Sequence, residues 1–185
     1  MRSVKPRKMR PQFLVLCEGE TEEAYINFLK QRYRLPIKIV PRIVGGKISQ
    51  RLIDRYKEDM YSDPSEIKTF LMYDGDVSDV LNSLEKCNGI RLISNPCIEI
   101  WFLSHFKKVP ESDMTSDSCI KMLCTIDGWE QYKKGFLTAK QQDFLWESRI
   151  KAVMTMKGRT EVNKTYSTVY LLIEILEEEK RKTDL

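Results

Sequence analysis

Short apolar runs alternate with amphipathic stretches over the first half of the chain. The run 13–17 is continuously apolar, as is typical of a buried strand, and it ends just before Glu18. Behind it, apolar residues at helical spacing predict a helix with Thr21 as its expected N-cap. Pro36 and Pro41 limit the next strand to an edge or irregular position. The remaining expected strands are 37–44, 69–73 and 90–93, with helices around 48–60 and 77–86.

This order is strand–helix repeated three times and closed by a strand. It predicts an α/β fold with a mostly parallel four-stranded sheet, flanked by helices and joined by right-handed crossovers. From about residue 97 the pattern becomes helical, with helices expected at 97–106, 118–124, 140–156 and 167–182. We therefore expect a basic N-terminal arm (1–10) followed by a single domain (11–185). Its core would be 11–106, and a helical extension, 107–185, would pack on the sheet.

Composition excludes several classes of protein. No run approaches the roughly 18 apolar residues that a bilayer span requires, and no signal-peptide pattern follows the basic N-terminus, which favours a cytoplasmic protein without membrane contact. The five cysteines form no CxxC pair, and His105 is the only histidine, so neither a structural zinc site nor a disulfide framework is expected. The net charge of +4 is too small to establish nucleic-acid binding.

Acidic residues follow two of the predicted strands. Glu18 comes directly after the first strand and Asp74 directly after the third, and Asp76 shares a face with Asp74 in extended chain. Ligands bind outside the carboxyl ends of parallel strands, so the three carboxylates would meet there if these strands are neighbours. Such crowding is unfavourable unless protons or a cation neutralise it, and Mg²⁺ prefers oxygen ligands of this kind. Turns and helix N-caps also attract acidic residues, which is the structural alternative.

Other motifs carry weaker signals. The Gly45-Gly46-Lys47 stretch lacks the full phosphate-loop pattern, so a P-loop is rejected. A basic margin beside the acidic site and an ordinary solvated face are both consistent with four basic residues, Arg42, Lys47, Arg51 and Arg55. A phosphotransferase of the haloacid-dehalogenase kind is disfavoured, because its motif belongs on the first strand and wants Thr or Val where this chain has Ser78. Trp101 and Phe102 are expected in the core, and His105 as a buried, hydrogen-bonded side chain.

Several segments resemble a known family. Residues 17–23, Cys-Glu-Gly-Glu-Thr-Glu-Glu, resemble the first motif of Toprim domains of the OLD-nuclease type, and Asp74-Gly75-Asp76 resembles their DxD motif. The stretch 93–106 is similar to the SNPCxExWxLxHF segment of the RloB-like (abortive-infection) Toprim family, and 167–170 resembles the end of that family. The resemblance covers nearly the whole chain, and its third segment is the distinctive one.

The resemblance implies a Toprim-like (Rossmann-like) fold, a Mg²⁺ or Mn²⁺ site and a nuclease that cleaves DNA or RNA. It also implies a role in bacterial anti-phage defence with an ATPase partner. Glu18 would be a metal ligand or the general acid/base, and Asp74 and Asp76 would be metal ligands. Glu22 or Glu23 would be a further ligand, although both also suit a helix N-terminus. Glu99 would lie near the site.

Three matters stay open at the level of sequence. The resemblance implies a lysine or further acidic residues late in the domain, and the sequence does not distinguish between Lys151, Lys157 and Lys164 as that lysine. A non-catalytic Toprim-like module that binds nucleic acid or a partner is the alternative function. The oligomeric state, including a homo-oligomer, is undecided.

Overall fold

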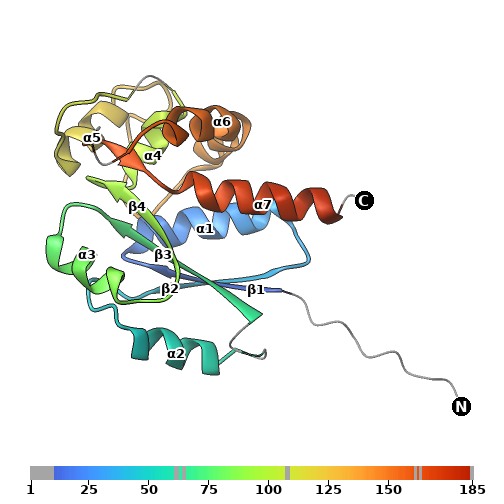
Figure 1. The fold of residues 1–185 in the computed structure, drawn as a ribbon. Helices are drawn as coiled ribbons and strands as arrows, with labels where there is room; N and C mark the ends of the chain where they lie inside the picture. Colours follow the sequence, from blue (N-terminus) through green and yellow to red (C-terminus); the bar gives the residue numbers. More distant parts are fainter. Residues whose placement is uncertain are drawn as a thin grey trace, which may run out of the picture.

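In the computed structural model of the protein, a twisted sheet separates two layers of helices (Figure 1). The structure describes residues 11–60, 63, 66–106, 109–160, 162 and 164–183, so the predicted basic arm at 1–10 lies outside the described residues. The strands are β1 (Gln12–Cys17), β2 (Lys38–Ile43), β3 (Ile67–Asp74), β4 (Ile90–Asn95) and β5 (Tyr166–Ser167). The helices are α1 (Glu20–Tyr33), α2 (Gln50–Glu58), α3 (Ser78–Glu85), α4 (Glu99–Ser104), α5 (Ser116–Leu123), α6 (Ala139–Lys157) and α7 (Tyr170–Thr183).

The sheet has the order β2-β1-β3-β4-β5, and its first four strands are parallel. The predictions of a mostly parallel sheet and of an edge or irregular position for β2 are confirmed, and β1 and β3 are neighbours, the condition under which the carboxylates were expected to meet. The prediction of four strands was wrong, because β5 pairs antiparallel with β4 through Ser94–Ser167 and Asn95–Tyr166. A two-residue strand is too short to show a periodicity, so the segment was included in the final helix, which begins only at Tyr170.

Alternate residues of the central strands enter two separate cores. Phe13, Val15 and Cys17 of β1 pack into the larger core, which is shared with α1, α4, α5, α6 and α7. Leu14 and Leu16 pack into the smaller core beneath α2 and α3. Because both faces are covered, β1 is continuously apolar from Phe13 to Cys17. Trp101 and Phe102 are fully buried in the larger core, as predicted.

The start of α1 differs from the sequence prediction. Gly19, and not Thr21, is the N-cap, and its N–H donates to Oε2 of Glu22 at 3.0 Å. Thr21 is the second residue of the helix, and its Oγ1 accepts a hydrogen bond from the Gly135 N–H at 2.9 Å. The residue predicted to cap the helix therefore attaches a distant loop to it.

Helix α7 runs beside α1 on the same side of the sheet (Figure 1). Arg149 of α6 lies 2.7 Å from Glu177 of α7, and the same carboxylate oxygen of Glu177 accepts from the Tyr33 hydroxyl of α1 at 2.8 Å. This partly buried group connects three helices. No helix among the residues described is both long and apolar enough to cross a membrane.

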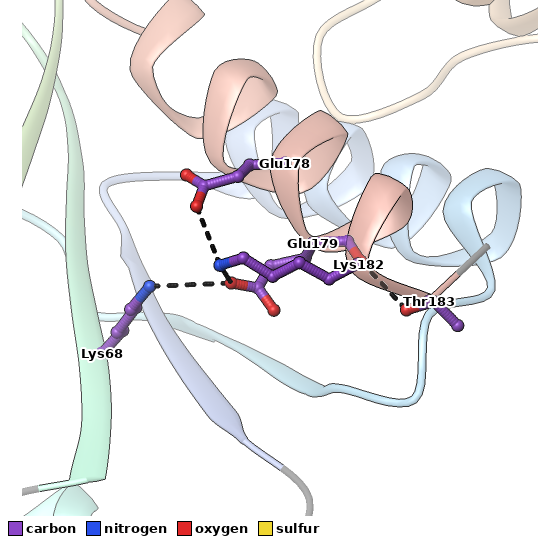
Figure 2. Close-up of polar contacts among 5 residues, drawn as sticks. All are labelled: Lys68, Glu178, Glu179, Lys182 and Thr183. Atoms are coloured by element: carbon purple, nitrogen blue, oxygen red, sulfur yellow. Dashed lines mark hydrogen bonds and ion pairs between the residues drawn. The ribbon is translucent and has the colours of Figure 1, made fainter. Parts of the chain in front are cut away.

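The end of α7 carries a more exposed set of charges (Figure 2). Lys182 Nζ lies 2.8 Å from Glu178 Oε1 and 3.1 Å from Glu179 Oε1. Glu179 also lies 4.0 Å from Lys68 of β3, which brings this end of the helix over the beginning of that strand. Since Lys182 and Glu178 are each more than half exposed, these pairs contribute little to stability.

Candidate functional site at the carboxyl edge of the sheet

Glu18 and Asp74 lie side by side where β1 and β3 end. The Glu18 N–H donates to Met72 O at 3.0 Å, which extends the strand pairing by one residue. The Glu18 carboxylate then turns toward β3, and its Oε2 accepts from the Asp74 N–H at 2.9 Å. The predicted meeting of these two carboxylates is explained by the β1–β3 pairing, which is parallel and in register up to Cys17 and Met72.

Asp74 also contacts the segment that precedes α4. Its Oδ1 accepts from the Ile98 N–H at 3.0 Å. The neighbouring Gly75 donates from its N–H to Ser94 O at 2.8 Å, and a Cβ at position 75 would lie 2.9 Å from the Asn95 Cβ. Only glycine permits this close approach, which holds the Asp74 turn against the end of β4.

Two further acidic residues complete the cluster. Glu22, in the first turn of α1, is only 5% exposed although one of its oxygens caps the helix. Glu99, the first residue of α4, is fully buried, and its Oε1 accepts from the Tyr132 hydroxyl at 2.8 Å. Its other oxygen, Oε2, has no hydrogen-bond partner among the described residues. A buried carboxylate with an unsatisfied oxygen is costly, so its retention points to a role beyond packing.

Burial and the neighbouring carboxylates raise the pKa values of two members of the cluster, Asp74 and Glu22. Burial, together with the negative charges of Glu22, Glu18 and Glu99, raises the pKa of Asp74 from 3.8 to about 8. Burial and the charges of Glu99 and Glu18 also raise the pKa of Glu22, against the opposing hydrogen bonds to its carboxylate. This is the electrostatic signature of like charges held together in a poorly solvated site, and such signatures concentrate at functional sites.

One cation, Lys134, compensates part of this negative charge. Burial acts to lower the pKa of its ammonium, but the charges of Glu99, Asp74 and Glu22 hold that pKa above its ordinary value. Lys134 lies in the loop between α5 and α6, where no strand end or helical pattern marked it in the sequence. Only the packing of the loop on α1 and α4 brings it to the cluster.

The three lysines considered from sequence are engaged elsewhere. Lys151 donates to Phe106 O at 2.9 Å, Lys157 pairs with Glu174 at 2.6 Å, and Lys164 pairs with Asp113 at 2.5 Å. The positive charge beside the carboxylates therefore comes from Lys134.

Asp76 and Glu23 occupy different surroundings from the cluster. Asp76 is exposed, with its Oδ2 3.5 Å from the Ser116 hydroxyl at the beginning of α5. It is not among the charges that raise the Asp74 pKa. Glu23 is half-buried, and its charge contributes, after burial and Glu22, to raising the pKa of the Cys17 thiol. The structure thus brings together Glu18, Glu22, Asp74 and Glu99 more closely than the remaining two candidates.

The carboxylate oxygens of the cluster are chemically suited to a hard divalent cation, but their side chains are not arranged around a common point that could hold one. Oxygen donors in a crowded, poorly solvated cluster are suited to Mg²⁺ or Mn²⁺. In the part of the chain that the structure describes, however, no group of three or more His, Cys, Asp or Glu side chains is arranged to hold a metal ion. One carboxylate oxygen in each of Glu18, Glu22 and Asp74 accepts a hydrogen bond from a backbone N–H. A bound ion would therefore have to be coordinated by the other oxygen of each carboxylate.

The predicted basic margin is mixed in charge. The Val44 N–H donates to Cys17 O at 2.9 Å, so the loop that carries Lys47 does start at the same edge of the sheet as Glu18. Arg51 and Arg55 of α2 are exposed, but they line a surface hollow of about 650 Å³ together with Asp54 and Glu58. A role for these cations in phosphate binding stays a prediction.

Fold and site together define a class: an α/β protein with a mostly parallel sheet that gathers carboxylates at the carboxyl ends of β1 and β3. The sequence matches the model of one family, described as RloB-like protein, over residues 13–176. Since this match spans most of the chain, the protein belongs to the RloB-like family. No curated protein and no solved structure was found to match the chain.

Proposed function

We propose that this RloB-like protein is a Toprim-type nuclease that uses Mg²⁺ or Mn²⁺ to hydrolyse phosphodiester bonds of DNA or RNA. One observation carries the proposal: four carboxylates from separate elements converge at the sheet edge, where burial and the charges of Glu22, Glu18 and Glu99 raise the pKa of Asp74 to about 8. A site with this excess of negative charge gains from binding a cation. The motif resemblance at residues 17–23 and 74–76 supports the same function.

The chain's own residues would have distinct roles. Glu18 and Asp74 are the proposed ligands, through the oxygens that do not accept from the Asp74 and Ile98 N–H groups. Glu22 is the proposed additional ligand from α1, and Glu99 lies behind them, held by Tyr132. Asp76 is a weaker candidate because it is exposed, and Glu23 is weaker because its charge acts on the Cys17 thiol. A bound divalent ion would lower the pKa of the attacking water and neutralise charge on the scissile phosphate.

The cellular setting is also a proposal, and it rests on the family resemblance alone. We infer an anti-phage role in the bacterial cytoplasm, with an ATPase as partner. An ATPase encoded beside the gene would support the partnership.

The test is cleavage of single-stranded and duplex DNA and RNA with Mg²⁺ or Mn²⁺, by the protein alone and with the ATPase. Asp74→Asn and Glu18→Gln should abolish cleavage while the far-ultraviolet circular dichroism spectrum stays unchanged. Asp79→Asn is the matched control, because it removes an exposed carboxylate from the first turn of α3 and should leave cleavage intact. If the wild-type protein cuts none of these substrates in either setting, the nuclease proposal fails.

A non-catalytic module that binds nucleic acid or a partner protein is the second candidate. It is favoured by the finding that, among the described residues, no ready-made metal-binding group exists, and by the structural hydrogen bonds of Glu18, Glu22 and Asp74. Calorimetric titration with Mg²⁺ or Mn²⁺ separates the two. Tight two-site binding that Asp74→Asn removes supports the nuclease, whereas absence of binding heat supports the module.

A further inference from the structure

A tight turn, Lys133–Phe136, lies next to the carboxylate cluster, and only its Lys134 belongs to the site described above. The Phe136 N–H donates to Lys133 O at 3.4 Å, and the two residues form an isolated antiparallel bridge. Gly135 has a φ of +79°, a conformation that favours glycine. A Cβ at position 135 would also lie 2.9 Å from Glu20 Oε2, so the turn is closely packed against the start of α1.

The turn is anchored on two sides of the site. The Gly135 N–H donates to Thr21 Oγ1 at 2.9 Å, which attaches the turn to the helix that carries Glu22. Tyr132, one residue before the turn, is buried and donates from its hydroxyl to Glu99 at 2.8 Å. A segment held at both points presents its side chains in a fixed position relative to the carboxylates.

Phe136 is 64% exposed on this anchored turn. The phenylalanines of the sheet and of α1 and α4, in contrast, are at most 2% exposed: Phe13, Phe28, Phe70 and Phe102. Lys133 and Lys134 precede the ring, and the Lys134 charge interacts with Asp74 and Glu99. A solvent-facing aromatic ring beside lysines is the combination with which proteins bind single-stranded nucleic acid, since bases stack on the ring and phosphates contact the ammonium groups.

We propose that the Lys133–Phe136 turn binds the substrate strand, with the Phe136 ring stacked on an unpaired base and Lys133 and Lys134 on the adjoining phosphates. The inference rests on the proposed function, because the carboxylate edge is where the scissile phosphate would lie. It specifies that function further: a base can stack on Phe136 only if it is not already enclosed in a duplex. The preferred substrate is therefore single-stranded or locally unpaired nucleic acid.

Binding, measured without cleavage, tests the inference. Fluorescence anisotropy would follow a labelled pyrimidine oligonucleotide, as RNA and as DNA, and a blunt duplex of matching length, in EDTA and again in Ca²⁺. The wild-type protein should prefer the single strand. Phe136→Ala should weaken single-strand binding about tenfold and leave duplex binding unchanged, because stacking on one aromatic ring is lost. Phe136→Trp should bind at least as well as the wild-type protein.

Met154→Ala is the matched control, since Met154 is 75% exposed on α6 and lies outside the turn. The inference is overturned if Phe136→Ala binds single strands like the wild-type protein in both buffers. It is also overturned if the wild-type protein binds no single strand, or binds duplex equally well. These measurements do not depend on catalysis. If binding depends on Phe136 but the protein cleaves no nucleic acid, the nuclease proposal is refuted and the inference that the Lys133–Phe136 turn binds nucleic acid is kept.

Discussion

Replacing Asp74 with asparagine should stabilise the metal-free protein, and the gain should grow with pH. In the folded chain the pKa of Asp74 is raised from 3.8 to about 8, first by burial and then by Glu22, Glu18 and Glu99. Below about pH 4 the carboxyl is protonated in both states and costs nothing. Between about pH 4 and 8 the unfolded chain loses this proton and the folded chain keeps it, so the folded state becomes progressively less favourable.

The magnitude follows from the same shift. A change of one in pKa corresponds to about 1.36 kcal/mol, so a rise from 3.8 to about 8 gives at most about 5.7 kcal/mol above pH 8. At pH 5 the corresponding limit is only about 1.7 kcal/mol. Asp74 is partly solvated, which reduces both figures, and we expect a gain of about 2–3 kcal/mol at pH 8. Asparagine keeps the acceptor for the Ile98 N–H, so the variant loses the charge without losing that hydrogen bond.

The assay is urea unfolding of wild-type and variant protein in EDTA at pH 5, 7 and 8, followed by circular dichroism. Asp76→Asn, which removes an exposed carboxylate two residues away, should show no comparable gain. Adding Mg²⁺ at pH 8 should raise the unfolding midpoint of the wild-type protein more than that of Asp74→Asn. A variant that is less stable than the wild-type protein, or a gain that does not increase with pH, would refute the electrostatic account of the cluster.

Three further predictions concern single residues outside the carboxylates. Burial lowers the pKa of His105 from 6.5 to about 4, so this residue should cost up to about 3.4 kcal/mol of stability as pH falls from about 6.5 to 4. In urea unfolding, His105→Leu should therefore lose less stability in acid than the wild-type protein. An equal loss in both proteins would contradict the lowered pKa. Arg149→Met should destabilise the protein by about 1–3 kcal/mol, because the ion pair with Glu177 is partly buried and the Arg149 guanidinium lies 4.0 Å from the centre of the Trp146 ring. Lys182→Met, at the exposed pairs of Figure 2, should change the unfolding free energy by less than about 0.5 kcal/mol. Equal effects of the two variants on urea unfolding would refute this ranking. Gly135→Ala should destabilise the protein by about 1–2 kcal/mol because Gly135 has a φ of +79°. Gly158→Ala should leave stability nearly unchanged, because Gly158 has a φ of −87° and no atom lies within 4 Å of an added Cβ. Equal shifts of the two variants in thermal unfolding would contradict this reasoning.

The parts of the fold that sequence could predict are those whose pattern is long enough to repeat. The runs 13–17 of β1 and 70–73 of β3 are apolar because both faces of these strands are buried, and Pro41 indicated the edge strand. β5 could not be predicted, because two residues show no periodicity and its position depends on pairing with β4 and on the Thr168 hydroxyl, which accepts from the Ile93 N–H at 2.7 Å.

Some residues of the candidate site could be predicted from the sequence, and others could not. Glu18 and Asp74 could be predicted because each directly follows a strand, and the ends of neighbouring parallel strands meet. Glu99 was indicated only by family resemblance, since a residue opening a helix has no intrinsic reason to be buried. Lys134 and Tyr132 were missed because their loop has no pattern, and its place over the site depends on contacts with Thr21 and Glu99 that are far away in the sequence.

The hydrogen bonds within the carboxylate cluster do not explain why four acidic residues are gathered where β1 and β3 end. Helix capping accounts for one oxygen of Glu22 and the Tyr132 bond for one oxygen of Glu99, but neither accounts for placing both carboxylates within electrostatic reach of Asp74. Neutral side chains could accept the same N–H and O–H groups without the repulsion, so a purely structural role would favour amides at these positions. Ionisable carboxyl groups stand at these positions at a cost to stability, and Lys134 balances only part of the charge they carry when ionised. That combination is expected where a further cation, brought by a ligand or bound as a metal, completes the balance during function.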